Sequence, residues 1–205
     1  MSVDRPSRFV VAWASGPDPA ALAGRIVPAT RARTAGRAGV PWVGDGQPAY
    51  EEAVQRAYRD RVPGGVRPGW DYLPLASGVA LTQAVKHRRG RRLERVDVRA
   101  TIGPLVEQPY AVHLERLNGC LRDRLGCLTR KTHAFAKDEQ TWDAALGMAL
   151  FEHNWLRPHV ALRQPLPEPI DGRRYRRRTP AMAIGLADHP WTMHEFLTRP
   201  VYQRR

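Results

Sequence analysis

Two acidic residues, Asp45 and Glu115, stand at positions where a carboxylate could take part in chemistry. Asp45 lies between two glycines, directly after a short apolar run over residues 40–43 that predicts a strand. In α/β folds functional groups gather at the carboxyl ends of strands, so a functional carboxylate is one interpretation of this position. The alternative is a turn aspartate, because Gly-Asp-Gly is also a common turn sequence.

Glu115, Asn118 and Arg122 share one face of a helix that a leucine repeat predicts over residues 112–128. At about 100° per residue, the three polar side chains lie within about 60° of one another, beside the leucine stripe. A carboxylate, an amide and a guanidinium in this arrangement could hold a metal-bound phosphodiester, with the carboxylate on the metal and the arginine on the phosphate. The alternative is a solvated face with an incidental charge pair.

The balance of charge points to a polyanionic partner. The 205 residues include 33 lysines and arginines against 20 aspartates and glutamates, which gives a formal net charge of +13. Nucleic acid is the commonest partner of so basic a chain. The charge is concentrated in residues 86–92 and 173–178, although either segment could be a solvated face. The second segment interleaves an aromatic ring with guanidinium groups, as nucleic-acid contacts do. It contains Arg173, Arg174, Tyr175, Arg176 and Arg177.

Composition excludes a membrane-spanning chain and a disordered acidic one. Hydrophobic residues make up 42% and charged residues 26% of the chain, and the longest apolar runs fall far below the roughly 18 residues of a spanning helix. Asp4, Arg5 and Pro6 stand where a signal peptide would need apolar residues. Cys120 and Cys127 are too few for a disulfide framework and do not have the spacing of a metal pair. We therefore expect a cytoplasmic protein.

Hydrophobic periodicity predicts a layered α/β or α+β domain. The predicted strands cover residues 8–14, 40–43, 79–81 and 93–101. The predicted helices cover residues 18–27, a segment from Pro48, residues 112–128, 138–154 and 180–184, and a last turn from Trp191. We expect the first helix to end at Pro28. Between these elements we expect a loop over residues 61–75, a basic hairpin tip over 86–92 and a Pro-rich linker over 165–169.

Several motifs resemble insertion-sequence transposases of the Asp-Asp-Glu (DDE) superfamily, whose catalytic domain has an RNase H-like fold. Three of them are His113-Leu-Glu-Arg-Leu-Asn-Gly-Cys-Leu-Arg122, Thr129-Arg-Lys-Thr-His-Ala-Phe-Ala-Lys137 and Phe151-Glu-His-Asn-Trp-Leu-Arg-Pro-His159. Arg178-Thr-Pro-Ala-Met-Ala183 resembles the tail of that family, and Trp42-Val-Gly-Asp-Gly46 resembles the strand end that carries its second catalytic aspartate. The resemblance covers nearly the whole chain.

The resemblance implies a DNA transposase that cleaves and transfers strands by divalent-metal chemistry. Asp45 matches the second catalytic aspartate and Glu115 the catalytic glutamate, and both would hold metal; two Mg²⁺ (or Mn²⁺) ions are expected in the complete enzyme. DNA, as transposon ends and target, is the expected partner, and the complete enzyme is expected to be a homo-oligomer. The expected DNA-binding residues are Arg116, Asn118, Arg122, Arg130, Lys131, Arg173, Arg174, Arg176 and Arg177.

The resemblance also sets the expected boundaries. Residues 1–160 would form a partial RNase H-like catalytic domain with a loop and hairpin insertion at 61–101, and residues 161–205 a basic linker and short helices. The family's first catalytic aspartate lies on a strand that would precede this chain, so we expect that residue and the first strands to be missing. Asp4 is expected in a hairpin turn, and the alternative is that it supplies the missing metal ligand.

Two other functions compete with a transposase. The chain could be a non-enzymatic basic DNA-binding protein that shares the fold, either a transposase remnant or an inhibitor of transposition. It could also be an RNA-binding basic protein of ribosomal type. The Glu115, Asn118 and Arg122 face and the strand end at Asp45 argue against the ribosomal type, because a plain RNA binder needs neither.

Overall fold

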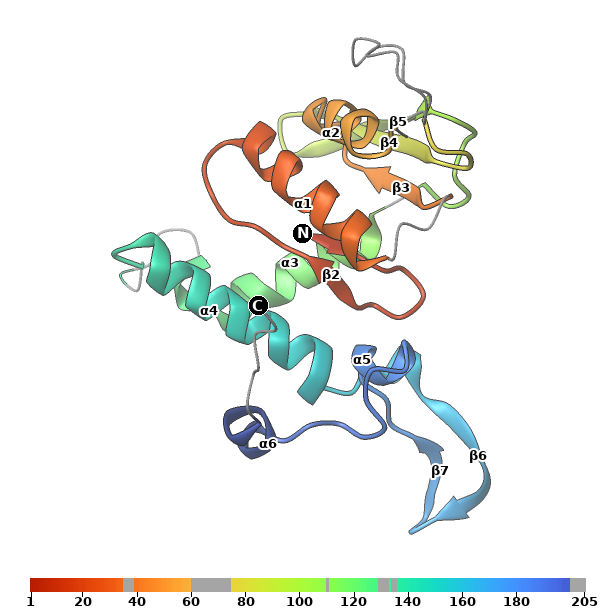
Figure 1. Ribbon diagram of the computed structural model, residues 1–205, viewed down its shortest axis with the longest axis vertical. Coiled ribbons are helices and arrows are strands. Elements are labelled where there is room, and N and C mark those ends of the chain that lie inside the picture. The colour runs from red at the N-terminus through yellow and green to blue at the C-terminus, as the bar shows by residue number, and fades with distance from the viewer. Residues whose placement is uncertain (35–38, 60–74, 110, 129–132, 134–135, 200–205) are drawn as a thin grey trace, which may run out of the picture. The chain divides into compact units, whose positions relative to one another are not determined.

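The computed structural model describes residues 1–34, 39–59, 75–109, 111–128, 133 and 136–199 (Figure 1). It divides into two compact units, one within residues 1–2 and 11–115 and the other within residues 3–10 and 116–205. The sequence-based boundary at residues 160 and 161 stays a prediction.

The first unit is built on a mixed three-stranded sheet in the order β3-β4-β5. β3 (Pro41–Gly44) runs parallel to β4 (Ala80–Arg89), and β4 pairs antiparallel with β5 (Arg92–Ile102). Helices α1 (Pro19–Arg33) and α2 (Ala49–Ala57) pack together beside this sheet (Figure 1). Their shared core consists of Val27, Val54, Tyr58, Val79, Leu81 and Ile102. The prediction of a mixed α/β fold with a sheet flanked by helices is confirmed at this level.

Helix α1 begins as expected but is longer than predicted. The Asp18 side chain caps it by accepting hydrogen bonds from the backbone N–H groups of Ala20 and Ala21. The prediction that it ends at Pro28 is wrong, because the helix continues to Arg33. A proline removes one backbone hydrogen bond, and burial on both sides of Pro28, from Val27 to Thr30, keeps the helix intact.

The basic segment over residues 86–92 is strand rather than an extended tip. β4 continues to Arg89 and β5 starts at Arg92, so only Gly90 and Arg91 form the turn, with Gly90 at a φ of 61°. On this hairpin the ring of His87 lies 2.8 Å from the Asp97 carboxylate. The predicted hairpin is confirmed, and its basic residues lie along paired strands.

Two longer helices follow in the chain, and the first of them begins in the first unit and continues in the second from Arg116. α3 (Val112–Arg124) has Leu117 and Leu121 buried, and a 3₁₀ turn follows it at Gly126–Leu128. α4 (Glu139–Phe151) is capped by the Asp138 side chain, which accepts from the Thr141 N–H at 2.7 Å. A π-helical turn, Glu152–Leu156, continues α4 and ends before Pro158. Both predicted helices are confirmed, although the first ends in a 3₁₀ turn and the second in a π-helical turn.

The chain's tail holds a β-hairpin and two short helices. β6 (Gln164–Ile170) pairs antiparallel with β7 (Arg173–Arg176), followed by α5 (Pro180–Ala183) and α6 (Met193–Thr198). Thr192 and Glu195 form the capping box of α6 that their spacing indicates. Both short helices are confirmed.

The predicted Pro-rich linker over residues 165–169 is wrong, because these residues form most of β6. β6 pairs with β7 at Gln164, Pro165 and Ile170, and the register shifts between Pro165 and Ile170. Pro167 and Pro169 lie within this irregular stretch. A proline lacks the N–H donor of a regular ladder, so prolines are compatible with an edge strand that is paired irregularly.

The chain begins with a short hairpin. β1 (Ser2–Val3) and β2 (Val10–Ala12) form a two-stranded sheet, so the strand predicted over residues 8–14 is confirmed in a shorter form. Between them Asp4 accepts the backbone N–H of Ser7 on its carboxylate at 3.0 Å, and its own N–H donates to the Phe9 carbonyl at 2.8 Å. Asp4 is therefore a turn residue, as expected.

Candidate functional site

Asp45 follows β3 directly and is exposed. The register of the parallel pair places Gly44 opposite Gln83, so the position level with Asp45 on the neighbouring strand is Ala84. The Asp45 charge, together with burial as the larger cause, raises the pKa of Tyr50 at the start of α2. The strand thus ends in a carboxylate that solvent can reach.

The turn after Asp45 requires a glycine. Gly46 has a φ of 90°, and a Cβ built on it would come within 2.6 Å of Val85 Cγ2 on β4. Any side chain here would push the turn away from β4 and move Asp45 with it. Gly46 therefore has a structural reason in addition to the turn that the sequence indicates.

Two buried polar residues of β4 fasten the segments around the candidate carboxylates. Gln83 is 1% exposed, and its side-chain Nε2 donates to the Gln47 carbonyl at 3.1 Å, in the turn after Asp45. Thr82 is fully buried, and its hydroxyl accepts the Val106 N–H at 2.9 Å, in the segment that leads to α3. Successive residues of a strand point to opposite faces, so β4 anchors one segment on each face. Sequence reasoning missed both residues, and the one available indication was their position directly after the strand predicted over residues 79–81.

Glu115 lies in the first turn of α3, and its carboxylate forms an ion pair with Lys86 of β4. Both side chains are partly exposed, at 52% for Glu115 and 34% for Lys86. Lys86 lies two residues beyond the position level with Asp45. Since Asp45, Lys86 and Glu115 all belong to the first unit, the parallel strand pair brings the two candidate carboxylates to the same end of the sheet.

The two carboxylates that the resemblance assigns to metal differ in what they contact. Asp45 is exposed, whereas Glu115 is paired with Lys86. Mg²⁺ is commonly held by one or two carboxylates and completes its coordination with water and substrate phosphate. In the part of the chain that the structure describes, no group of three or more His, Cys, Asp or Glu residues could hold a metal. Both ions expected from the resemblance stay a prediction.

The other predicted residues of α3 lie as the helix geometry requires. Arg116 and Arg122 are exposed and Asn118 is half-buried, whereas the helix buries Leu117 and Leu121. Asn118 and Arg122 follow Glu115 by three and seven residues, so they share its side of the helix. Arg130 and Lys131 fall outside the described residues.

The predicted basic residues near the chain's end lie on β7 and just after it. Arg173, Arg174, Arg176 and Arg177 are all exposed. Arg176 donates a hydrogen bond to the Asp188 backbone carbonyl, while the Arg163 guanidinium lies 4.3 Å from the centre of the Tyr175 ring. The hairpin therefore displays a dense group of guanidinium groups around one tyrosine.

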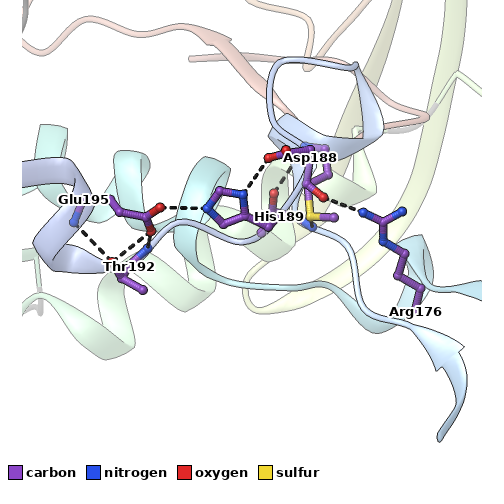
Figure 2. Close-up of polar contacts among 7 residues, drawn as sticks. Arg176, Asp188, His189, Thr192 and Glu195 are labelled. Atoms are coloured by element: carbon purple, nitrogen blue, oxygen red, sulfur yellow. Dashed lines mark hydrogen bonds and ion pairs between the residues drawn. The ribbon is translucent and has the colours of Figure 1, made fainter. Parts of the chain in front are cut away.

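A network of charged side chains follows this hairpin (Figure 2). His189 Nδ1 lies 2.6 Å from the Asp188 carboxylate and His189 Nε2 lies 2.8 Å from the Glu195 carboxylate. Because ionised carboxylates only accept hydrogen bonds, both ring nitrogens must carry protons to satisfy both contacts. Hydrogen bonds to Glu195 and then Asp188 raise the pKa of His189, and bonds from Thr192 and His189 lower the pKa of Glu195 to about 2.

The motif over residues 151–159 has a structural role in the second unit. The buried Asn154 side chain accepts the Val10 N–H at 2.9 Å and donates to the Val10 carbonyl at 3.0 Å. Beside it, His153 Nε2 lies 2.9 Å from the Arg8 carbonyl, and Arg8 has a φ of 64°. Side chains of the π-helical turn thus bond the backbone of residues 8–10, as a neighbouring strand would do with its own backbone groups.

His153 and His159 are in contact, with ring centres 4.6 Å apart. Burial lowers the pKa of His153, and burial together with the neighbouring His153 lowers the pKa of His159 to about 4. His159 Nε2 is buried without a hydrogen-bond partner among the described residues. Both rings are therefore neutral at pH 7 and contribute to packing.

Comparison of the chain with protein-family models, with curated proteins and with solved structures gave no match in any of the three. Among the described residues, no helix combines the length and the apolar character needed to cross a membrane.

Proposed function

We propose that this chain acts in DNA transposition, as a transposase of the DDE superfamily with an RNase H-like catalytic domain. The observation that carries the proposal is the parallel β3–β4 pair, which places Asp45 and the Lys86–Glu115 ion pair at the same end of one sheet. The resemblance of the motifs around Asp45, Glu115 and Asn154 to those transposases supports it.

In this proposal Asp45 and Glu115 hold a divalent cation, Mg²⁺ or Mn²⁺, together with a DNA phosphate. When bound, the cation would lower the pKa of an attacking water or DNA 3′-hydroxyl and stabilise charge on the phosphoryl oxygens. Lys86 pairs with Glu115, and a cation held by Glu115 would have to replace this ion pair. Gln83 and Thr82 position the segments that carry the two carboxylates.

The basic residues bind DNA through its phosphates. Arg116 and Arg122 are exposed on α3 near Glu115, and Asn118 can donate a hydrogen bond from the same side. Binding through many such contacts weakens steeply as salt rises, because each neutralised phosphate releases a counterion. With a chain charge of +13, we expect a strong salt dependence.

The test is nicking of a supercoiled plasmid by the purified chain in MnCl₂, followed by gel electrophoresis. Asp45→Asn and Glu115→Gln are expected to reduce the nicking rate at least about 100-fold, since each removes a charge that the transition state requires. Glu52→Gln is the matched control, because Glu52 is exposed on α2 and forms an ion pair with Arg56 one helical turn later. It should nick like the parent chain. Equal nicking by Asp45→Asn and the parent would overturn the assignment.

A second candidate function is DNA binding without cleavage. The Lys86–Glu115 ion pair favours it, because a lysine already satisfies one of the two carboxylates. The same experiment separates the two functions. A binding protein would retain the plasmid in a gel-shift assay and leave it supercoiled at every Mn²⁺ concentration, in the parent chain as well as in both variants.

A further inference from the structure

An open pocket of about 610 Å³ lies in the second unit, between the β6–β7 hairpin, α5 and the segment around His189. Leu166, Ile170, Met182 and Pro190 give it an apolar lining. Pockets of this size accommodate small organic groups with a ring system. The DNA-phosphate contacts described above do not explain an apolar hollow of this kind.

The border of the pocket is strongly basic. Between residues 163 and 178 the chain has six arginines and two acidic residues. Arg173 and Arg177 line the pocket and are exposed, so a polyanion can reach them. Asp188, which also lines the pocket, is already paired with His189 and therefore opposes an anion less than its charge alone would suggest (Figure 2).

Tyr175 connects the apolar lining with the basic border. It lies on β7, lines the pocket and is 43% exposed. The Arg163 guanidinium lies over its ring, 4.3 Å from the ring centre, and helps to fix the position of the ring. Aromatic rings so placed in a basic groove stack on nucleic-acid bases with little regard to sequence.

We propose that this pocket receives an unpaired nucleotide of a DNA strand, with the base against Tyr175 and the apolar lining and the flanking phosphates on Arg173 and Arg177. A base inside a duplex keeps its faces stacked on its neighbours and offers only its edges, which call for aimed polar groups rather than an apolar floor. A phosphate alone would need the arginines and no hollow. The inference rests on the proposed DNA function and adds that the protein holds single-stranded DNA next to its hairpin.

The test measures binding of the full chain to three fluorescein-labelled probes by anisotropy. The probes are a 15-nucleotide oligothymidine, the same length of abasic strand, and a 15-base-pair duplex. The oligothymidine is expected to bind about tenfold more tightly than the abasic strand, because stacking on one ring contributes about a tenfold change or more. It is also expected to bind more tightly than the duplex.

Variants identify the pocket as the cause. Tyr175→Ala is expected to remove the preference for oligothymidine over the abasic strand while leaving abasic binding nearly unchanged, and Tyr175→Phe should retain the preference. The double variant Arg173→Ala with Arg177→Ala should weaken binding of all three probes and reduce the salt dependence. Arg91→Ala, on the other exposed hairpin turn, is the control and should keep the preference for the oligothymidine.

The outcomes separate this inference from the proposed function. Equal binding of oligothymidine and abasic strand, or an unchanged preference in Tyr175→Ala, overturns the pocket while plasmid nicking can still depend on Asp45. Tighter binding of the duplex, lost in Tyr175→Ala, also overturns it. Conversely, a preference that depends on Tyr175 in a chain that does not nick DNA supports the pocket and contradicts the proposed cleavage.

Discussion

The polar side chains at the strand end and at the π-helical turn differ in their exposure to solvent and in their hydrogen bonding. Asp45 is exposed, and buried neighbours such as Gln83 hold the backbone around it. Asn154 is 7% exposed, and both ends of its amide are used by the backbone of Val10. Both residues belong to motifs of similar specificity, yet only the first can meet a ligand. Motif strength therefore says little about whether a residue acts in chemistry or in architecture.

The largest expected effect on stability comes from Asn154. Asn154→Ala leaves the Val10 N–H and carbonyl buried without partners, and we expect a loss of about 2–4 kcal/mol in the free energy of unfolding. Urea unfolding measures this, and hydrogen exchange at the Val10 amide locates it. Asp45→Asn is the comparison and should change stability by less than about 0.5 kcal/mol, as exposed substitutions do. An equal loss of stability in the two variants would contradict the structural role that we assign to Asn154 alone.

Gly46→Ala tests whether the turn beside Asp45 is as tightly specified as we infer. The substitution adds a steric clash with Val85 to the strain of a positive φ, and we expect a loss of about 1–3 kcal/mol. Gly90→Ala is a matched control, since Gly90 also has a positive φ but no atom within 4 Å of the added Cβ. In urea unfolding Gly46→Ala should therefore be the more destabilising of the two. If both cost the same, Val85 does not constrain the turn.

Acid should weaken the second unit through its paired histidines. The folded pKa of His159 is about 4, below the usual value of 6.5, so between these pH values the unfolded chain binds more protons than the folded chain. Stability is therefore intact above pH 6.5 and falls as the pH is lowered towards 4, by about 1–2 kcal/mol after discounting for partial solvent exposure. Urea midpoints from pH 7 to 4 measure this. His159→Gln should flatten the decline, and an identical decline in that variant would contradict the assignment.

The smallest effect is expected at the exposed network around His189. Glu195→Gln removes the strongest cause of the raised His189 pKa, so that pKa should fall, as an NMR titration of the ring can measure. In the parent chain the His189 contribution to the docking of α6 is complete below the ordinary histidine pKa and is lost as the pH rises through the raised value. The Glu195 contribution is complete above the ordinary carboxyl pKa and is lost as the pH falls to about 2. His194→Gln, on the same helix, should leave the His189 pKa unchanged.

Much of the secondary structure could be predicted from local sequence. Asp18, Asp138 and Thr192 cap the helices where their side chains indicate, and the apolar run before Asp45 is β3. The errors arose where a residue with a strong local preference was overruled by its surroundings. Pro28 remains inside α1 because neighbouring residues are buried, and the prolines of β6 form an edge.

The candidate site was predictable only in part. Glycines and a strand end indicate Asp45, and helical spacing groups Glu115 with Asn118 and Arg122. The pairing of Glu115 with Lys86 depends on the register of a parallel strand pair and on a helix more than twenty residues later in the chain. The hydrogen bonds of Gln83 and Thr82 to distant backbone groups depend on the same register. Long-range pairings of this kind are not encoded in any local pattern, so no local reading of the sequence could supply them.

The three prolines of β6 also affect the tendency of the protein to aggregate. A two-stranded ribbon standing apart from a larger sheet offers its outer edges as templates on which other chains can add strands and aggregate. Prolines lack the N–H donor that strand addition uses, so the prolines of β6 make such addition unfavourable, and the arginines of β7 repel a second copy of the same ribbon. We therefore expect this hairpin to resist edge-to-edge aggregation.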